Sequence, residues 1–305
     1  MKMKFEKFCG KRLKDAMQLR EMKMTELAEK TGIKKQSLSL YAYDINNPPV
    51  ENVFKIANIL NIPYQFFMTE SLQTIETGRA FFRSQASATK RARSAASKKM
   101  QYVALLYEVL LSKIDFPKLN LPDTSKYDFK IDFQNPDSDE AVQRIEDLAE
   151  EVRNYWKLGN GPIDNIQYVL ESNGIVVTGF TDTGTHIDAY SQKIIGDDRI
   201  LYLVALEIGE KPFERLRFDM AHELGHILMH GGLIEEDELS KEEFSAMEKQ
   251  ANMFASAFLL PRIQFSRMVA AYPTTVDYYR ELKKTWKVSM QAMMYRTWQL
   301  EIITS

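Results

Sequence analysis

Three polar residues on one predicted helix have the types and spacing of a metal-dependent hydrolase. His222 and His226 are four residues apart, so both imidazoles project from one helix face, one turn apart. Two nitrogens at that separation can bind a single zinc ion at about 2.0–2.1 Å. Glu223 lies about 100° further round the helix, where it can act as a general base on a water molecule. The pattern predicts metal-assisted hydrolysis.

A catalytic zinc site also needs a third protein ligand and one open position. The acidic run at 235–238 is typical of a solvated loop. Glu248 instead lies in a predicted helix that begins with the capping box Ser240–Glu243, and it shares a face with Ala251 and Ala255. A carboxylate beside a buried apolar stripe is costly unless it has a partner. We therefore predict Glu248 as the third ligand.

The other two histidines have weaker claims on this site. His230 continues the row four residues after His226, and a fourth ligand there would close the site, so we predict that it packs or caps the helix end. His186 lies in a turn-like segment and is predicted to be an ordinary loop residue, although it could approach the site as an electrophilic helper.

The elements that must position these residues form an α+β pattern. The most β-rich stretch, Arg199–Ile208, comes directly before the motif helix, predicted at Phe213–His230. Further strands are predicted at Gly174–Val177 and Ile187–Ala189, and further helices at Ala141–Leu158, Pro162–Asn173, Ser240–Leu260 and the C-terminal segment. Gly225 is unusual inside a helix and predicts close approach of another segment. The expected fold is mostly α with a small β-sheet.

The N-terminal segment has the features of a helix-turn-helix domain. Residues 12–68 show five short helical patterns, with Gly32 breaking the chain between the second and the third, Lys34–Tyr43. Residues 1–47 hold eleven Lys/Arg against six Asp/Glu, although the whole chain has a net charge of −2. We therefore predict double-stranded DNA as the partner of residues 1–70. A protein-interaction module is the alternative for this domain.

Composition sets the domain plan. At 305 residues the chain allows two domains, each with its own core. We predict a basic helical connector over 71–114 and a zinc metallopeptidase-like domain over 115–305 that ends in a helical segment. No apolar run approaches the roughly 18 residues of a membrane span. The single cysteine, Cys9, excludes an internal disulfide, and the expected location is the cytoplasm.

Two long motifs give the sequence a family resemblance. Phe218–His230, together with Glu248–Ala255 and Leu259–Pro261, closely resembles the ImmA/IrrE family of zinc metallopeptidases. Further segments look like landmarks of family members that carry an N-terminal Cro/phage-repressor (XRE) helix-turn-helix: Phe81–Ser84, Gly161–Ile163 and Trp286–Ser289. The resemblance covers almost the whole chain.

The resemblance implies a small sheet packed against gluzincin-like helices, with His222, His226 and Glu248 as zinc ligands. It also implies a protein substrate, because family peptidases cleave helix-turn-helix repressors and so derepress stress or mobile-element genes. Relatives often have an Asn at the end of the strand before the active-site helix, where this chain has Leu203–Leu206.

In an XRE-like domain the third helix enters the major groove. Matched by position, the base-reading candidates are Lys35, Gln36 and Leu40, with Ser37 nearer the DNA backbone. Lys can read guanine and Gln can read adenine, so sequence preference is feasible.

Two functions remain open at this point. The first is a DNA-binding regulatory zinc peptidase that cleaves a repressor. The second is an XRE-type transcriptional regulator whose peptidase-like domain senses a ligand or a metal without proteolysis. Glu223 favours the first, because a sensor needs no general base. The sequence leaves the oligomeric state open, a homodimer included.

Overall fold

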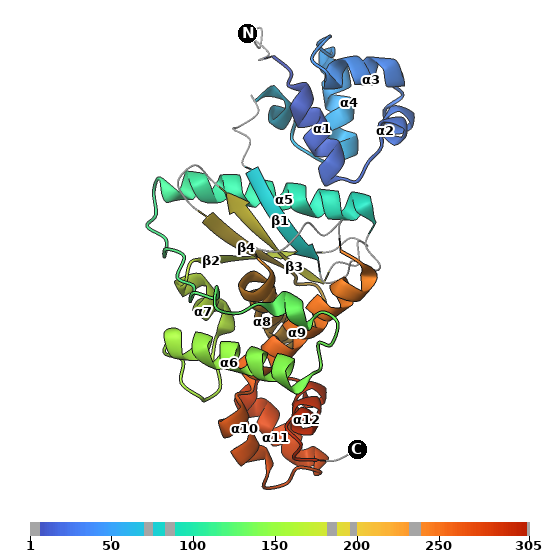
Figure 1. Ribbon diagram of the computed structural model, residues 1–305. Helices are drawn as coiled ribbons and strands as arrows, with labels where there is room; N and C mark the ends of the chain where they lie inside the picture. The colour runs from blue at the N-terminus through green and yellow to red at the C-terminus, as the bar shows by residue number, and fades with distance from the viewer. Residues whose placement is uncertain are drawn as a thin grey trace. The chain divides into compact units, whose positions relative to one another are not determined.

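The computed structural model describes residues 7–69, 76–82, 89–181, 188–195, 200–231 and 239–303. The chain divides into two compact units (Figure 1). The first unit comprises Met1–Thr77 and Ser87–Ile114, and the second comprises Gly78–Ala86 and Asp115–Ser305. Within the described ranges, no helix is both long and apolar enough to cross a membrane.

The first unit is a bundle of short helices. Its elements are α1 (Gly10–Leu19), α2 (Met24–Thr31), α3 (Lys35–Ala42), α4 (Val50–Leu60), a short 3-10 helix (Tyr64–Met68) and α5 (Lys90–Leu111). Gly32 adopts a left-handed conformation with φ 69°, which ends α2 and turns the chain into α3 as predicted. Leu13, Leu27, Leu38 and Ile56 are fully buried in the core. The predicted helix-turn-helix domain is confirmed.

Within the predicted helical connector, 71–114, the structure describes one strand and one helix, α5. Glu76–Phe82 forms a strand, β1, that belongs to the sheet of the second unit. Gly78 disfavours a helix, and the aromatic pair Phe81-Phe82 favours a strand. The helix predicted for this segment is therefore wrong at Glu76–Phe82.

Helix α5 is held to α1 by a partly buried polar cluster. The hydroxyl of Tyr102 donates a 3.0 Å hydrogen bond to Asp15 and accepts one of 3.0 Å from Arg12. Lys98 forms a 3.0 Å ion pair with the same aspartate. Burial, reinforced by the charge of Asp15, raises the pKa of Tyr102 to about 12, so its hydroxyl stays protonated. The helical part of the predicted connector is therefore part of the first unit.

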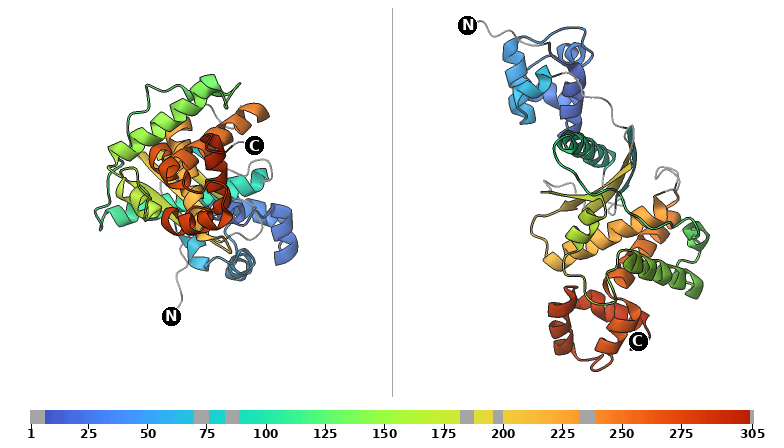
Figure 2. Two further views of the ribbon diagram at one scale, coloured as in Figure 1. Left: turned by 90° about the horizontal axis from the view of Figure 1, so that it is seen from below. Right: turned by 90° about the vertical axis from the view of Figure 1, so that its left-hand side faces the viewer.

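The second unit combines a small sheet with seven α-helices among its described residues. The helices are α6 (Asp139–Tyr155), α7 (Ile166–Ser172), α8 (Phe213–His230), α9 (Lys241–Leu259), α10 (Arg262–Val269), α11 (Val276–Trp286) and α12 (Met290–Gln299), with a 3-10 helix, η2 (Phe129–Asp132), before α6. The sheet lies on one side of α8 and α9, and α10–α12 lie on the other (Figures 1 and 2).

The strands β2 (Ile175–Phe180), β3 (Ala189–Ile195) and β4 (Ile200–Glu207) run in the order β1-β3-β4-β2. β4 pairs parallel with β2 and antiparallel with β3. Strand β3 continues six residues beyond the end of the predicted Ile187–Ala189 strand. The mostly helical α+β class is confirmed.

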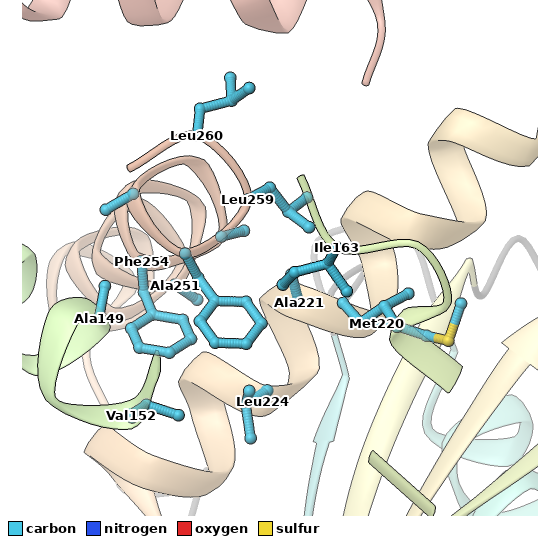
Figure 3. Close-up of a cluster of buried hydrophobic side chains, with 14 of the residues drawn as sticks. Ala149, Val152, Ile163, Met220, Ala221, Leu224, Ala251, Phe254, Leu259 and Leu260 are labelled. Atoms are coloured by element: carbon cyan, nitrogen blue, oxygen red, sulfur yellow. The ribbon is translucent and has the colours of Figure 1, made fainter. Parts of the chain in front are cut away.

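Helices α8 and α9 pack unusually closely. A Cβ atom on Gly225 would lie 3.1 Å from the Phe254 ring and 3.4 Å from the backbone of Ala251. Figure 3 shows these residues of α9 against Leu224 and Ala221 of α8 within the largest buried cluster. The approach that Gly225 predicts is observed, and it brings the polar faces of the two helices together.

Two fully buried arginines fix the loops around α8 and α9. Arg217 donates hydrogen bonds of 2.5, 3.1 and 3.0 Å to the carbonyls of Ile163, Asp164 and Lys287. Arg153 likewise donates to three carbonyls, those of Gly159, Gly161 and Phe258. Charge-assisted bonds of this kind satisfy backbone acceptors that burial would otherwise leave unpaired. They explain why the Gly161–Ile163 and Trp286–Ser289 segments sit beside α8.

Candidate metal centre

The structure brings His222, His226 and Glu248 together at the contact of α8 and α9. The Nε2 atoms of the two histidines are 3.0 Å apart, and the Glu248 oxygens lie 3.4 Å from His222 and 3.0 Å from His226. Donor atoms around a tetrahedral zinc with bonds of about 2.05 Å are about 3.3 Å apart. The three side chains therefore have the spacing that one zinc ion requires.

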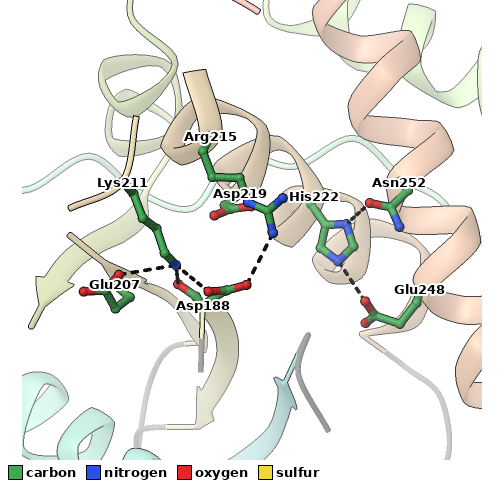
Figure 4. Close-up of polar contacts among 8 residues, drawn as sticks. All are labelled: Asp188, Glu207, Lys211, Arg215, Asp219, His222, Glu248 and Asn252. Atoms are coloured by element: carbon green, nitrogen blue, oxygen red, sulfur yellow. Dashed lines mark hydrogen bonds and ion pairs between the residues drawn. The ribbon is translucent and has the colours of Figure 1, made fainter. Parts of the chain in front are cut away.

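Asn252 sets the orientation of His222. The Nδ1 of His222 lies 3.1 Å from the Asn252 side-chain oxygen, which can only accept a hydrogen bond (Figure 4). The ring proton is then on Nδ1, and the lone pair of Nε2 points toward Glu248. From the sequence, Asn252 is expected on the helix face of Glu248, one turn further along α9, but no role was predicted for it.

His226 is oriented by a chain of buried hydrogen bonds. Its Nδ1 lies 2.9 Å from Nδ1 of His230, whose Nε2 lies 2.9 Å from the Gln250 side-chain oxygen. The Gln250 amide then donates a 3.0 Å bond to the carbonyl of Phe129 in η2. His230 contacts the candidate cluster of His222, His226 and Glu248 through His226. It is thus more than a helix-end residue, because it contacts His226 directly.

The electrostatics of the cluster favour a cation. Burial alone raises the pKa of Glu248, but the neighbouring His222 and His226 outweigh it and lower the pKa to about 2. Burial, reinforced by the neighbouring His226, lowers the pKa of His230 to about 3, so this imidazole is neutral at pH 7. Two lone pairs and one carboxylate thus converge on a single point, and a metal ion satisfies all three.

Glu223 is fully buried beside this cluster and has a partner on the sheet. The hydroxyl of Ser191, on β3, donates a 2.7 Å hydrogen bond to Oε2 of Glu223. Sequence analysis missed Ser191, because the pairing of β3 with β4 places it opposite α8 and no local motif marks it. Glu248 is 18% exposed, so the cluster reaches solvent on its side.

A network of ion pairs anchors the first turns of α8 to the sheet (Figure 4). Lys211 lies 2.7 Å from Asp188 and 3.5 Å from Glu207, at the ends of β3 and β4. Arg215, on α8, pairs with Asp188 at 3.3 Å and with the buried Asp219 at 3.1 Å. Because Asp219 precedes His222 by one turn, the network fixes the helix segment that carries the first histidine.

A cavity of about 650 Å³ lies between α8, α9 and the C-terminal helices. Asn252 lines it and also contacts His222, so the cavity reaches the candidate metal-binding cluster at this side chain. Phe218, Met253 and Tyr295 supply apolar wall, and charged side chains of both signs line it together with amides and hydroxyls. Sequence analysis did not predict this cavity, which forms from four separate segments.

The predicted DNA-binding residues lie together on α3. Lys35 and Gln36 are exposed, Ser37 and Leu40 are partly exposed, and Leu38 of the same helix is buried in the core. This arrangement leaves one face of α3 available for a partner. His186 and the acidic run at 235–238 lie outside the described residues.

Fold and site together define a helix-turn-helix protein with a metallopeptidase-like second unit. Family models match both parts: residues 181–297 match the IrrE N-terminal-like domain, and residues 13–67 match a helix-turn-helix domain of the XRE type. The chain therefore carries an IrrE N-terminal-like domain together with a DNA-binding helix-turn-helix domain, a combination that indicates a regulator.

Comparison with solved structures finds similarity to a Mycobacterium tuberculosis transcriptional regulator, at 20% identity and a TM-score of 0.38. The match covers 57% of this chain and 51% of that chain, so it spans about half the length of the regulator. Comparison with curated proteins finds no match.

Proposed function

We propose that this protein is a DNA-binding regulator whose IrrE N-terminal-like domain is a zinc-dependent endopeptidase that cleaves a helix-turn-helix repressor. One observation carries the proposal: His222, His226 and Glu248 offer ligand atoms within 4.8 Å of one another, with Glu223 directly beside them. A group that only held a structural metal would have no use for a buried carboxylate next to its first ligand.

The side chains divide the proposed reaction between them. When bound, zinc supplies Lewis-acid polarisation of the scissile carbonyl and lowers the pKa of the attacking water. Glu223 takes the proton from that water and passes it to the leaving amine nitrogen. Ser191 holds Oε2 of Glu223 at 2.7 Å, which limits its rotation before proton transfer. Asn252 and His230 hold the two imidazole rings in the required orientation.

The repressor as substrate rests on the helix-turn-helix domain and on the family resemblance. A peptidase that binds the same DNA region as its target would meet it at a raised effective concentration. Lys35, Gln36, Ser37 and Leu40 are the proposed DNA contacts, since they occupy the accessible face of α3.

The proposal is tested by comparing newly formed protein termini in cells that express the wild type or Glu223→Gln, with and without DNA damage. A cleavage site that occurs only with the wild type would identify both the activity and the substrate. Equal termini in every condition, with both proteins stably expressed, would contradict the peptidase.

The cavity beside Asn252 favours a second candidate, a regulator whose second unit senses a small ligand without proteolysis. Its volume of about 650 Å³ lies in the range of small-molecule sites, and its lining residue Asn252 contacts His222 of the cluster. This candidate predicts sequence-specific DNA binding that responds to an effector and is unchanged in Glu223→Gln. Loss of regulation in Glu223→Gln would exclude it.

A further inference from the structure

We propose that His230 and Gln250 are positioning residues that fix the ring orientation and tautomer of His226 and thereby set the metal affinity of the site. The inference rests on the zinc site of the proposed function but does not depend on proteolysis. It assigns a role to the third histidine of α8 and to a glutamine of α9 that the hydrolytic motif does not include.

The direction of every hydrogen bond in the chain is determined by its chemistry. If Nε2 of His226 binds a metal, its ring proton must be on Nδ1, because a neutral imidazole carries one proton. His226 then donates across 2.9 Å to Nδ1 of His230. The proton of His230 is consequently on Nε2, which donates across 2.9 Å to the side-chain oxygen of Gln250.

The chain ends on the backbone of another element. The Gln250 amide nitrogen can only donate, and it bonds the carbonyl of Phe129 at 3.0 Å. η2, which begins at Phe129, is itself fixed, because Asp132 accepts two bonds from Arg144 of α6 at 3.0 and 3.3 Å. His230 and Gln250 thus connect the ring of His226, the second proposed zinc ligand, to the backbone of η2.

Burial makes this arrangement specific. His230 and Gln250 are 0% exposed and His226 is 1% exposed, so water cannot replace a missing partner. Removing the acceptor on His230 would leave the Nδ1–H of His226 unpaired, and the opposite tautomer, with its lone pair turned away from Glu248, would become favourable. Partners of metal-bound histidines typically change metal affinity by about 10- to 100-fold.

The test measures zinc affinity of the full-length protein by competition with a chromophoric chelator. We expect His230→Leu to weaken zinc binding by about 10- to 100-fold. His230→Asn should recover part of the loss, because its side-chain oxygen can occupy the place of Nδ1 and accept from His226. Gln250→Met should weaken binding less than His230→Leu, since it acts one bond further from the ligand.

The control variant is Met229→Ala, which removes a buried apolar side chain from the same helix without touching the chain of hydrogen bonds. It should lower the thermal stability of the metal-free protein and leave zinc affinity unchanged. Equal zinc affinity in wild type and His230→Leu would overturn the proposal, and so would an equal loss in Met229→Ala.

Cobalt substitution distinguishes positioning from direct ligation. The visible spectrum of the Co²⁺-loaded His230→Leu protein should keep the wild-type band positions, because the ligands are unchanged. Altered bands would show that His230 is itself a ligand and would contradict the inference. If the wild type binds no zinc, the proposed function fails first; if all variants bind equally well, only this inference fails.

Discussion

Helices α3 and α8 carry their polar side chains in opposite environments. On α3, Lys35 and Gln36 are exposed, so water hydrates both side chains in the free protein. On α8, the side chains of the motif and the histidine that follows it are at most 1% exposed: His222, Glu223, His226 and His230. Each depends on a specific partner from β3, α8 or α9.

This difference in exposure means that the proposed DNA contacts on α3 can be substituted with little change in stability, whereas the buried polar residues on α8 cannot. Substitution at an exposed site usually changes the free energy of unfolding by less than about 0.5 kcal/mol. A buried polar group that loses its partner costs about 1–3 kcal/mol. The exposed face of α3 can therefore vary with little effect on stability, whereas the cluster on α8 requires its hydrogen bonds and its packing together.

The largest effect is expected from Glu223→Gln. Loss of the general base should lower the rate of substrate cleavage by about 10²- to 10⁴-fold. Zinc affinity should stay within a few-fold of wild type, because Glu223 is not a proposed ligand. The rate is measured on the substrate identified in cells, with the exposed Glu281→Gln on α11 as a control. Undiminished cleavage by Glu223→Gln would contradict the proposed mechanism.

Zinc binding should stabilise the second unit, which contains α8, and leave the helix-turn-helix helices α1–α4 unchanged. At a free zinc concentration about 100 times its dissociation constant, binding adds about 2.7 kcal/mol to the stability of the unit that binds it. Hydrogen exchange should therefore slow in α8, α9 and η2 and stay unchanged in α1–α4, and a chelator should reverse the effect. Equal protection of α1–α4 would show that the two regions are not energetically separate.

The metal-free protein should lose stability as the pH falls, through His230. Because its folded pKa is about 3, below the ordinary value of about 6.5, protonation favours the unfolded chain as the pH falls from 6.5 toward 3. At pH 5 the loss relative to His230→Asn should be roughly 2 kcal/mol. Urea unfolding at pH 7 and pH 5 measures it, and parallel losses in the two proteins would refute it.

Glu248 changes stability in a lower pH window. Its folded pKa of about 2 lies below the ordinary value of 4.5, so the stability it contributes is present above 4.5 and is lost as the pH falls toward 2. Comparison at pH 7 and pH 5 therefore leaves the contribution of Glu248 nearly constant.

The smallest effect on stability is expected on α3. Gln36→Ala should weaken specific DNA binding by about 1–3 kcal/mol if Gln36 reads a base. The free energy of unfolding should change by no more than about 0.5 kcal/mol. Lys55→Ala, an exposed lysine substitution on α4, serves as the control. Binding to a DNA sequence selected for affinity measures the first quantity, and urea unfolding measures the second. A large loss of stability in Gln36→Ala would contradict the difference in exposure between α3 and α8.

Local patterns in the sequence predict much of this molecule. The bounds predicted for the motif helix, Phe213–His230, are those observed, because helical periodicity and the glycine after its end are both local features. The position of Glu248 near the two histidines and the close helix contact at Gly225 were also predicted from helix geometry.

The rest depends on contacts between distant segments. Ser191 meets Glu223 through the packing of a sheet on a helix, and Gln250 meets Phe129 across 121 residues. The sequence predicts a helix at β1, since the residues that follow it have helical composition. The segment is a strand instead, because it pairs with β3, and local composition does not reveal that pairing.

The most direct test of the central claim is the zinc content of the purified full-length protein after zinc loading and dialysis, measured by plasma mass spectrometry. We predict one zinc ion per chain in the wild type and in Glu242→Ala, an exposed change on the same helix as Glu248. Glu248→Ala should retain far less zinc while keeping its helical circular dichroism. A wild type that retains no zinc, or a Glu248→Ala protein that retains a full equivalent, would contradict the account.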